Sequence, residues 1–152
     1  MAAPRDADEE SQGRMHGMID DIFFRFIPLA GGASNLAFAV NVMTPKLFAK
    51  CFASKDVVVS NCLWFNAHLG VGLYLYHRKH MALASTANRV LYSVFGAVLF
   101  NFGSVLLWAT MKTLLPKCDH VRALVGVASG VLLLFIGKDY LDHVDHRLES
   151  GQ

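Results

Sequence analysis

Charged residues are scarce in this sequence, and long stretches have none. Only 17% of the 152 residues are Asp, Glu, Lys or Arg, whereas an average soluble domain has about 25%. The 14 Lys and Arg and the 12 Asp and Glu residues all lie outside four windows, 26–45, 57–76, 90–111 and 123–137. This composition excludes disordered, collagenous and nucleic-acid-binding proteins and most soluble enzymes. It indicates a small multi-pass membrane protein.

The sequence also lacks the motifs of common catalytic sites. It has no glycine-rich phosphate loop, no Gly-x-Ser-x-Gly, no Cys-x-x-Cys and no His-Glu-x-x-His. The windows contain no acidic residue, which disfavours a proton-coupled transporter that uses carboxylates. No secretory signal is expected, and the acidic N-terminal segment disfavours a mitochondrial presequence. We therefore expect an endomembrane (ER-type) or plasma-membrane location.

Four helices are expected to cross the membrane. A helix needs about 20 apolar residues to cross about 30 Å of hydrocarbon, and it satisfies its own backbone polar groups. Short loops place consecutive helices side by side in opposite directions. The sequence therefore predicts an all-α membrane protein, an antiparallel four-helix transmembrane bundle over 21–138, with spans at about 21–43, 57–76, 90–111 and 121–137. Residues 1–20 are expected to form a flexible polar tail, and 139–152 an amphipathic polar tail.

The first span is the least typical of the four. It contains Pro28, Gly31, Gly32, Asn35 and Asn41, which lower helix propensity or disfavour insertion into lipid. We expect a helix that is kinked near the proline and packed on its neighbours. A re-entrant or surface-lying segment is the alternative.

Four spans would place both termini and the 77–89 loop on one membrane face. That face has eight Lys and Arg residues and the other face has six. The positive-inside rule therefore favours cytoplasmic termini, by two residues. Cys51 and Cys118 lie on the face opposite the termini, where they could form a disulfide if that face is luminal. Free thiols are the alternative.

Polar side chains within the spans predict contacts between helices. Asn61 and His68 belong to one stripe of the second span, and Asn101 lies on a stripe of small residues in the third. We expect an interhelical hydrogen bond, such as one from His68 to Asn101, to fix the register. The alternative is that His68 is a haem or metal ligand, or a proton relay.

The fourth span contains a Gly-x-x-x-Gly pattern. Gly126 and Gly130 form it, and Gly137 lies seven residues further on, roughly on the same face. Because a missing side chain lets two helices approach closely, these glycines predict a packing face. The neighbouring helix belongs either to this chain or to another protein.

Histidines and aspartates gather after the fourth span. If that span continues as a helix, Asp139, His143 and His146 share a face, and His77 and His80 lie on the same side of the membrane. Imidazole and carboxylate ligands at such spacings suit zinc or non-haem iron. The simpler interpretation is a polar helix end, where histidine interacts with the helix dipole and i,i+4 pairs form.

Three classes of function are compatible with these features. We expect a non-enzymatic scaffold, assembly factor or accessory subunit of a larger membrane complex, without a cofactor and with a membrane-protein partner or a second copy. One alternative is a metal- or haem-dependent membrane enzyme that uses the His/Asp cluster. The other is a carrier or pore for a lipid or small solute, along a seam of asparagines and His68. Because four spans hardly enclose a path, this carrier would have to be an oligomer.

Overall fold

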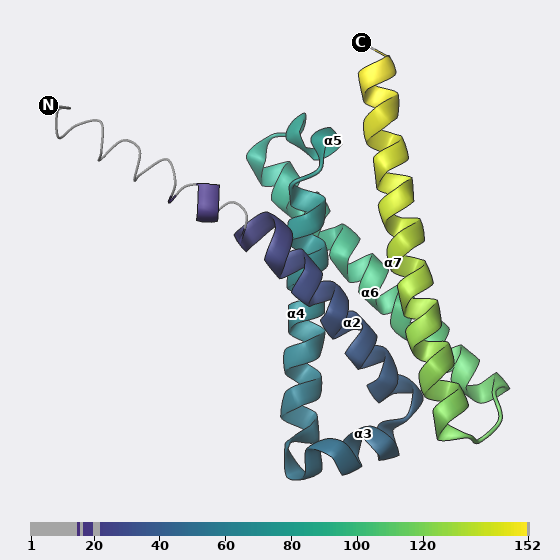
Figure 1. The fold of residues 1–152 in the computed structure, drawn as a ribbon. Coiled ribbons are helices and arrows are strands. Elements are labelled where there is room, and N and C mark those ends of the chain that lie inside the picture. Colours follow the sequence, from purple (N-terminus) through teal and green to yellow (C-terminus); the bar gives the residue numbers. More distant parts are fainter. Residues whose placement is uncertain (1–14, 16, 20–21, 152) are drawn as a thin grey trace, which may run out of the picture.

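The computed structural model describes residues 15, 17–19 and 22–151, and this part of the chain is helical (Figure 1). The predicted all-α class is confirmed. The predicted tail at 1–20 lies largely outside the described residues. The elements are a π-helical segment η1 (Ile22–Phe26), α2 (Ile27–Met43), α3 (Pro45–Phe52), a 3₁₀ turn η2 (Ala53–Lys55), α4 (Asp56–Tyr76), α5 (Lys79–Ala82), α6 (Thr86–Leu114) and α7 (Asp119–Ser150).

Three helical stretches are long and apolar enough to cross a membrane. They are Gly17–Met43, which contains α2, and the whole of α6 and α7. They indicate an integral multi-pass membrane protein. The helix α4, which corresponds to the second predicted span, is 21 residues long but is not among these three. Its asparagines and His68 lower its mean hydropathy.

The helices α2 and α4 cross at a pair of glycines. A Cβ atom at Gly31 would lie 2.5 Å from the Cα of Gly70, and one at Gly70 would lie 2.6 Å from the Cα of Gly31. Only glycine permits such an approach of two backbones. Beside the crossing, Asn66 Nδ2 of α4 donates a hydrogen bond of 2.8 Å to Ser34 Oγ of α2.

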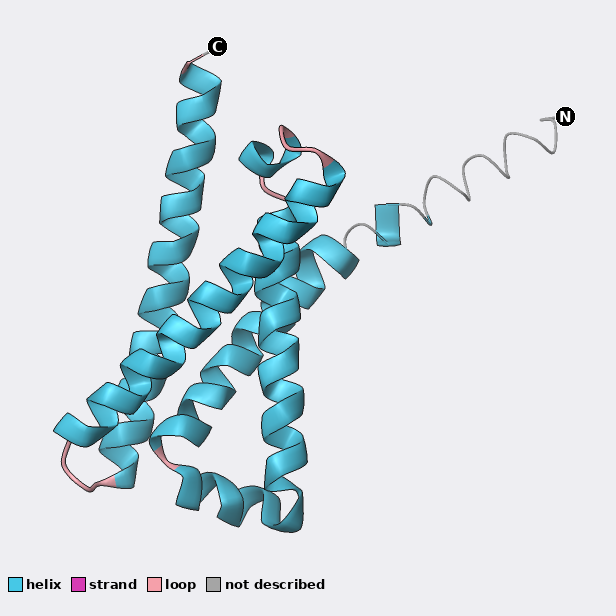
Figure 2. Cartoon of the chain, turned by 180° about the vertical axis from the view of Figure 1, so that it is seen from behind, coloured by secondary structure: helices cyan, strands magenta, loops and turns pink. Residues whose placement is uncertain are grey.

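The four long helices alternate in direction along the chain, as Figures 1 and 2 show. Asn41, near the end of α2, donates to Ser60, near the start of α4, so these helices are antiparallel. The helix α6 runs in the same direction as α2. Asn35 Nδ2 of α2 donates to Asn101 Oδ1 of α6 over 3.1 Å, midway along both helices.

The buried core lies where α2, α6 and α7 meet. Met43 of α2 and Trp108 of α6 are fully buried there. The glycines of α7 face this core: a Cβ at Gly126 would lie 2.8 Å from Met43 Cγ, and one at Gly130 would lie 2.8 Å from Leu36 Cδ2. The Gly-x-x-x-Gly pattern therefore packs against α2 of the same chain.

Two prolines lie at the starts of helices, Pro28 in α2 and Pro45 in α3. Pro28 lies in the first turn of α2, directly after the π-helical segment, so the helix type changes where a kink is predicted. Pro45 follows the end of α2 and is the first residue of α3, a position where its missing N–H costs nothing. The connection between the first two predicted spans, expected as a short loop, is therefore mostly helical.

The last two helices are longer than the spans predicted for them. Ser85 caps α6 by accepting a hydrogen bond from the N–H of Asn88, so α6 begins at Thr86 rather than at residue 90. The helix α7 continues to Ser150, thirteen residues beyond the predicted span end at 137.

Candidate functional site

The helix α7 extends well past its apolar part. Residues 123–137 have no charge, and the polar part begins at Lys138. At 1.5 Å per residue, the 32 residues of α7 measure about 48 Å, which exceeds the roughly 30 Å of hydrocarbon. Residues 138–150 therefore form a polar helical extension outside the membrane-spanning segment. This extension lies against α5 and the end of α4.

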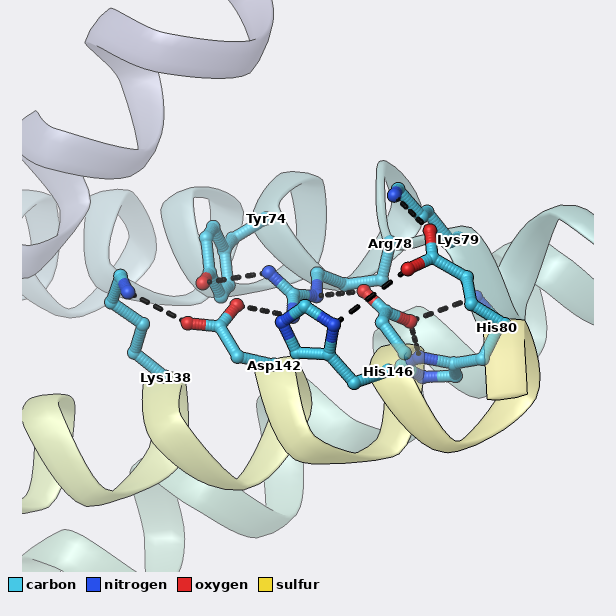
Figure 3. A network of polar contacts seen from close by, with 9 residues as sticks. Tyr74, Arg78, Lys79, His80, Lys138, Asp142 and His146 are labelled. Atoms are coloured by element: carbon cyan, nitrogen blue, oxygen red, sulfur yellow. Dashed lines mark hydrogen bonds and ion pairs between the residues drawn. The ribbon is translucent and has the colours of Figure 1, made fainter. Parts of the chain in front are cut away.

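Arg78, in the turn between α4 and α5, lies between two aspartates of the extension (Figure 3). Its Nη2 donates to Asp142 Oδ1 over 2.7 Å, and its Nε forms an ion pair with Asp145 Oδ2 at 3.0 Å. Its Nη1 donates to the hydroxyl of Tyr74 over 3.1 Å. The side chains of Arg78 and Asp145 are only 13% and 12% exposed. The guanidinium thus joins α4 to α7 away from bulk water.

Further ion pairs continue this contact on both sides. The backbone N–H and the Nδ1–H of His80 both donate to Asp145 Oδ1, over 3.0 and 2.7 Å. Lys138 Nζ donates to Asp142 Oδ2 over 2.7 Å, and Lys79 pairs with Glu149. We call these residues the ion-pair network: Tyr74, Arg78, Lys79, His80, Lys138, Asp142, Asp145 and Glu149.

The network shifts the pKa values of its exposed members. Hydrogen bonds from Lys138 and Arg78 lower the pKa of Asp142 from 3.8 to about 2. The hydrogen bond between Lys79 and Glu149 raises the pKa of Lys79 and lowers the pKa of Glu149. Each shift favours the charged form, so the network is fully ionised at these groups around neutral pH.

The predicted metal ligands do not gather around one point. His80 bonds to Asp145, while His146 Nδ1 lies 3.6 Å from Glu149 Oε2. His77 stacks on Phe24, with ring centroids 4.4 Å apart, at an open depression of about 250 Å³. Asp139 and His143 are exposed. Among the described residues, no group of three or more His, Cys, Asp and Glu side chains is placed to hold a metal ion.

His68 does not bond to Asn101, so that predicted pair is wrong. Its Nδ1–H donates to the carbonyl oxygen of Trp64 one turn earlier, over 2.8 Å. Its Nε2 is buried and has no hydrogen-bond partner among the described residues. Asn101 instead accepts from Asn35 and donates to the carbonyl oxygen of Ala97. Asn35 of α2 thus takes the place predicted for His68, whose ring lies near Phe102 of α6 instead, with ring centroids 6.1 Å apart.

The other predicted residues lie in three different settings. Asn61 is exposed on α4, and Gly137 lies beside Phe100 of α6, where a Cβ would be 3.6 Å from the ring. Cys51, Cys62 and Cys118 are exposed free thiols, so no disulfide joins Cys51 to Cys118. The first of these thiols is near the end of α3, and the last directly precedes α7.

The sequence interpretation did not single out the residues at the centre of the network. Arg78 and Asp145 carry its most buried contact, and neither belonged to the proposed ligand set. A signal was present, because Lys138, Asp142 and Asp145 follow at spacings of four and three and therefore share a helix face. Arg78 and Lys79, in the turn after α4, carry the positive charge that complements the two aspartates of this face.

No protein-family model matches this chain, and no curated protein or solved structure shows a significant similarity to it. Its function is therefore inferred from its own contacts.

Proposed function

We propose that this chain is a non-enzymatic scaffold, assembly factor or accessory subunit of a larger membrane complex, and that α6 contacts a partner helix. Gly103 is the observation that carries the proposal. It is exposed on α6, and a Cβ there would meet nothing within 4 Å. Every other glycine between residues 31 and 137 has an atom of a neighbouring helix within that distance. Glycine costs about 1 kcal/mol relative to alanine inside a helix.

The surroundings of Gly103 fit a second helix. Leu99 and Leu106 flank it on the same face of α6 and are 57% and 68% exposed. A notch between two large apolar side chains lets another backbone approach, and van der Waals contact then drives association in lipid. A close partner outside this chain accounts for a glycine that no neighbour within the chain explains.

The interior polar groups also favour a structural role over a solute path. Asn66 and Asn101, which belong to the seam expected for a carrier, bond to Ser34 and Asn35 of α2 across helix contacts. Such bonds fix the register between helices and are not free to accompany a solute. The polar residues within the spans are therefore consistent with a rigid subunit.

We further infer that α4 crosses the membrane and completes a four-span bundle. The candidate spans α2 and α6 run in the same direction (Figure 1). A chain that crosses twice in one direction must return between the two crossings, and α4 is the long helix that connects them. At 21 residues it measures about 31 Å, enough for one crossing. Two of its polar residues, Ser60 and Asn66, form hydrogen bonds with side chains of α2.

The test is gentle extraction from native membranes, followed by a native gel and mass spectrometry of co-migrating proteins. Wild type is expected in a stable complex larger than the monomer. Gly103→Leu should release the companion, because the leucine fills the notch, while the isolated chain keeps its thermal stability. Ala128→Leu, which enlarges an exposed residue of α7, is the matched control and should retain the companion.

Two results would contradict the proposal. One is a wild-type chain that migrates as a lone monomer after the mildest extraction. The other is a Gly103→Leu variant that holds its companion as firmly as the Ala128→Leu control.

A further inference from the structure

The end of the bundle formed by α3 and the α6–α7 turn has unpaired positive charge. Both segments lie at the end opposite the C-terminus (Figures 1 and 2). Lys46, Lys50, Lys55 and Lys117 are exposed there. Among the described residues, none of these four lysines has a hydrogen bond or ion pair. We call these four residues the lysine surface.

Acidic residues at this end do not neutralise the lysine surface. Asp56 and Asp119 lie in the first turns of α4 and α7, where a carboxylate interacts favourably with the helix dipole. The opposite end of the bundle differs, because Arg78, Lys79 and Lys138 are all paired with carboxylates of the network. The α3 end therefore presents four lysines without a carboxylate partner, whereas these three cations of the opposite end are neutralised by the fold.

The helix α3 is amphipathic and lies across the ends of α2 and α4. Phe48 is 5% exposed and packs into the bundle, whereas Lys46 and Lys50, four residues apart, are exposed. Phe52, at the end of the helix, keeps 40% of its surface exposed. A short helix with an apolar anchor and lysines on its other side is suited to the interface between hydrocarbon and headgroups.

The lysines of α3 are unfavourable in the chain by itself. Lys46 and Lys50 are like charges at i,i+4 spacing, and Lys46 also lies in the first turn, where the helix dipole disfavours a cation. Negative charge from outside the chain would remove both costs.

We propose that the lysine surface binds the anionic phospholipid headgroups of the leaflet in which this end of the bundle lies. The candidate spans end here, at Met43 and Leu114, which places the lysines at headgroup depth. Lipid phosphates supply the complementary charge, and each lysine near an anionic surface contributes about fivefold in affinity. This lipid contact is independent of the partner contact at Gly103.

The proposal has a consequence for orientation. Anionic lipids are concentrated in the cytoplasmic leaflet, so the α3 end faces the cytoplasm and the C-terminus the opposite side. The count of basic residues predicts the reverse. The difference arises because Arg78, Lys79 and Lys138 enter that count although carboxylates of the fold neutralise them.

The experiment compares lipid association with the full chain in vesicles of phosphatidylcholine. Spin-labelled phosphatidylserine and phosphatidylcholine are added as probes, and their relative association constants are measured. Wild type should prefer phosphatidylserine. Lys46→Gln with Lys50→Gln should reduce that preference at least fivefold, while Lys46→Arg with Lys50→Arg should retain it. Arg147→Gln, which removes an exposed charge at the other end, should leave it unchanged.

A second measurement needs no variant. The preference of wild type should fall as the salt concentration rises from 0.01 M to 1 M, because the Debye length shrinks from about 30 Å to about 3 Å. The proposal is overturned if wild type shows no preference at low salt, or if the glutamine variant keeps the preference. Retention of an acidic protein through Lys46 and Lys50, without a lipid preference, would assign the surface to protein and also overturn it.

Discussion

The crossing of α2 and α4 gives the sharpest prediction for stability. In Gly31→Ala, the new Cβ would lie 2.5 Å from the Cα of Gly70 and 3.0 Å from the carbonyl oxygen of Asn66. Carbon atoms in contact normally lie about 3.5–4.0 Å apart. The helices must therefore separate by about 1 Å or more, because the obstacle is backbone and has no other rotamer.

The size of the effect follows from three contributions. Forced overpacking costs about 1–3 kcal/mol. Separation also weakens the hydrogen bonds from Asn66 to Ser34 and from Asn41 to Ser60, both 2.8 Å long, at about 0.6 kcal/mol each. Replacing glycine by alanine in a helix returns about 1 kcal/mol. We expect Gly31→Ala to lower the free energy of unfolding by about 1–3 kcal/mol.

The adjacent Gly32 provides the control. A Cβ there would lie 3.7 Å from Leu134 Cδ1, which is ordinary contact. Gly32→Ala should therefore leave stability unchanged or raise it by up to about 1 kcal/mol. Both variants can be measured by reversible unfolding in mixed micelles. Equal effects of the two substitutions would refute the close crossing.

Three further predictions concern the two ends of the bundle. Arg78→Gln should destabilise the chain by about 1–3 kcal/mol in the same assay, because it leaves carboxylates without their cation. Lys138→Gln changes a side chain that is 61% exposed and should alter stability by less than about 0.5 kcal/mol. The pKa of Asp142 is lowered from 3.8 to about 2, so the stability from its ion pairs should persist above pH 4 and fall as the pH approaches 2. Hydrogen exchange in residues 138–150 measures this pH dependence, and Asp142→Asn should reduce it. Finally, a membrane-impermeant maleimide should label Cys51 and Cys118 from the same side of the membrane, which is the cytoplasmic side if the lipid proposal holds. Labelling from opposite sides would contradict the placement of both thiols at the α3 end of the bundle.

The helices could largely be predicted from the sequence, because the absence of charge is a property of each segment by itself. Their ends depend on single residues. Ser85 as a cap and Pro45 as a first helical residue were readable signals for the starts of α6 and α3. The continuation of α7 to Ser150 was not readable in the same way, because its polar residues are held by partners more than sixty residues away.

The pairing of polar residues was harder to predict than their presence. Asn101 and His68 were recognised as interhelical candidates, but the partner of Asn101 is Asn35. Spacing along one helix determines which side chains share a face, and it does not determine which helix covers that face. That depends on the close approach of α2 and α4 at Gly31 and Gly70, which brings α2 into the centre of the bundle.

The two halves of α7 are held by different physical means. Its first half packs on α2 through Gly126 and Gly130, where small size permits van der Waals contact. Yet only 11% of its most apolar stretch is buried within the chain, compared with 28% and 22% for the other two candidate spans. Apolar packing therefore does little to position the second half. Arg78 positions the second half instead. Its buried guanidinium bonds to two carboxylates and a tyrosine hydroxyl, and these bonds offset the cost of its desolvation only in this one geometry. The network thus fixes the direction in which α7 leaves the bundle, and with it the apolar face that α7 leaves open to lipid or to a partner.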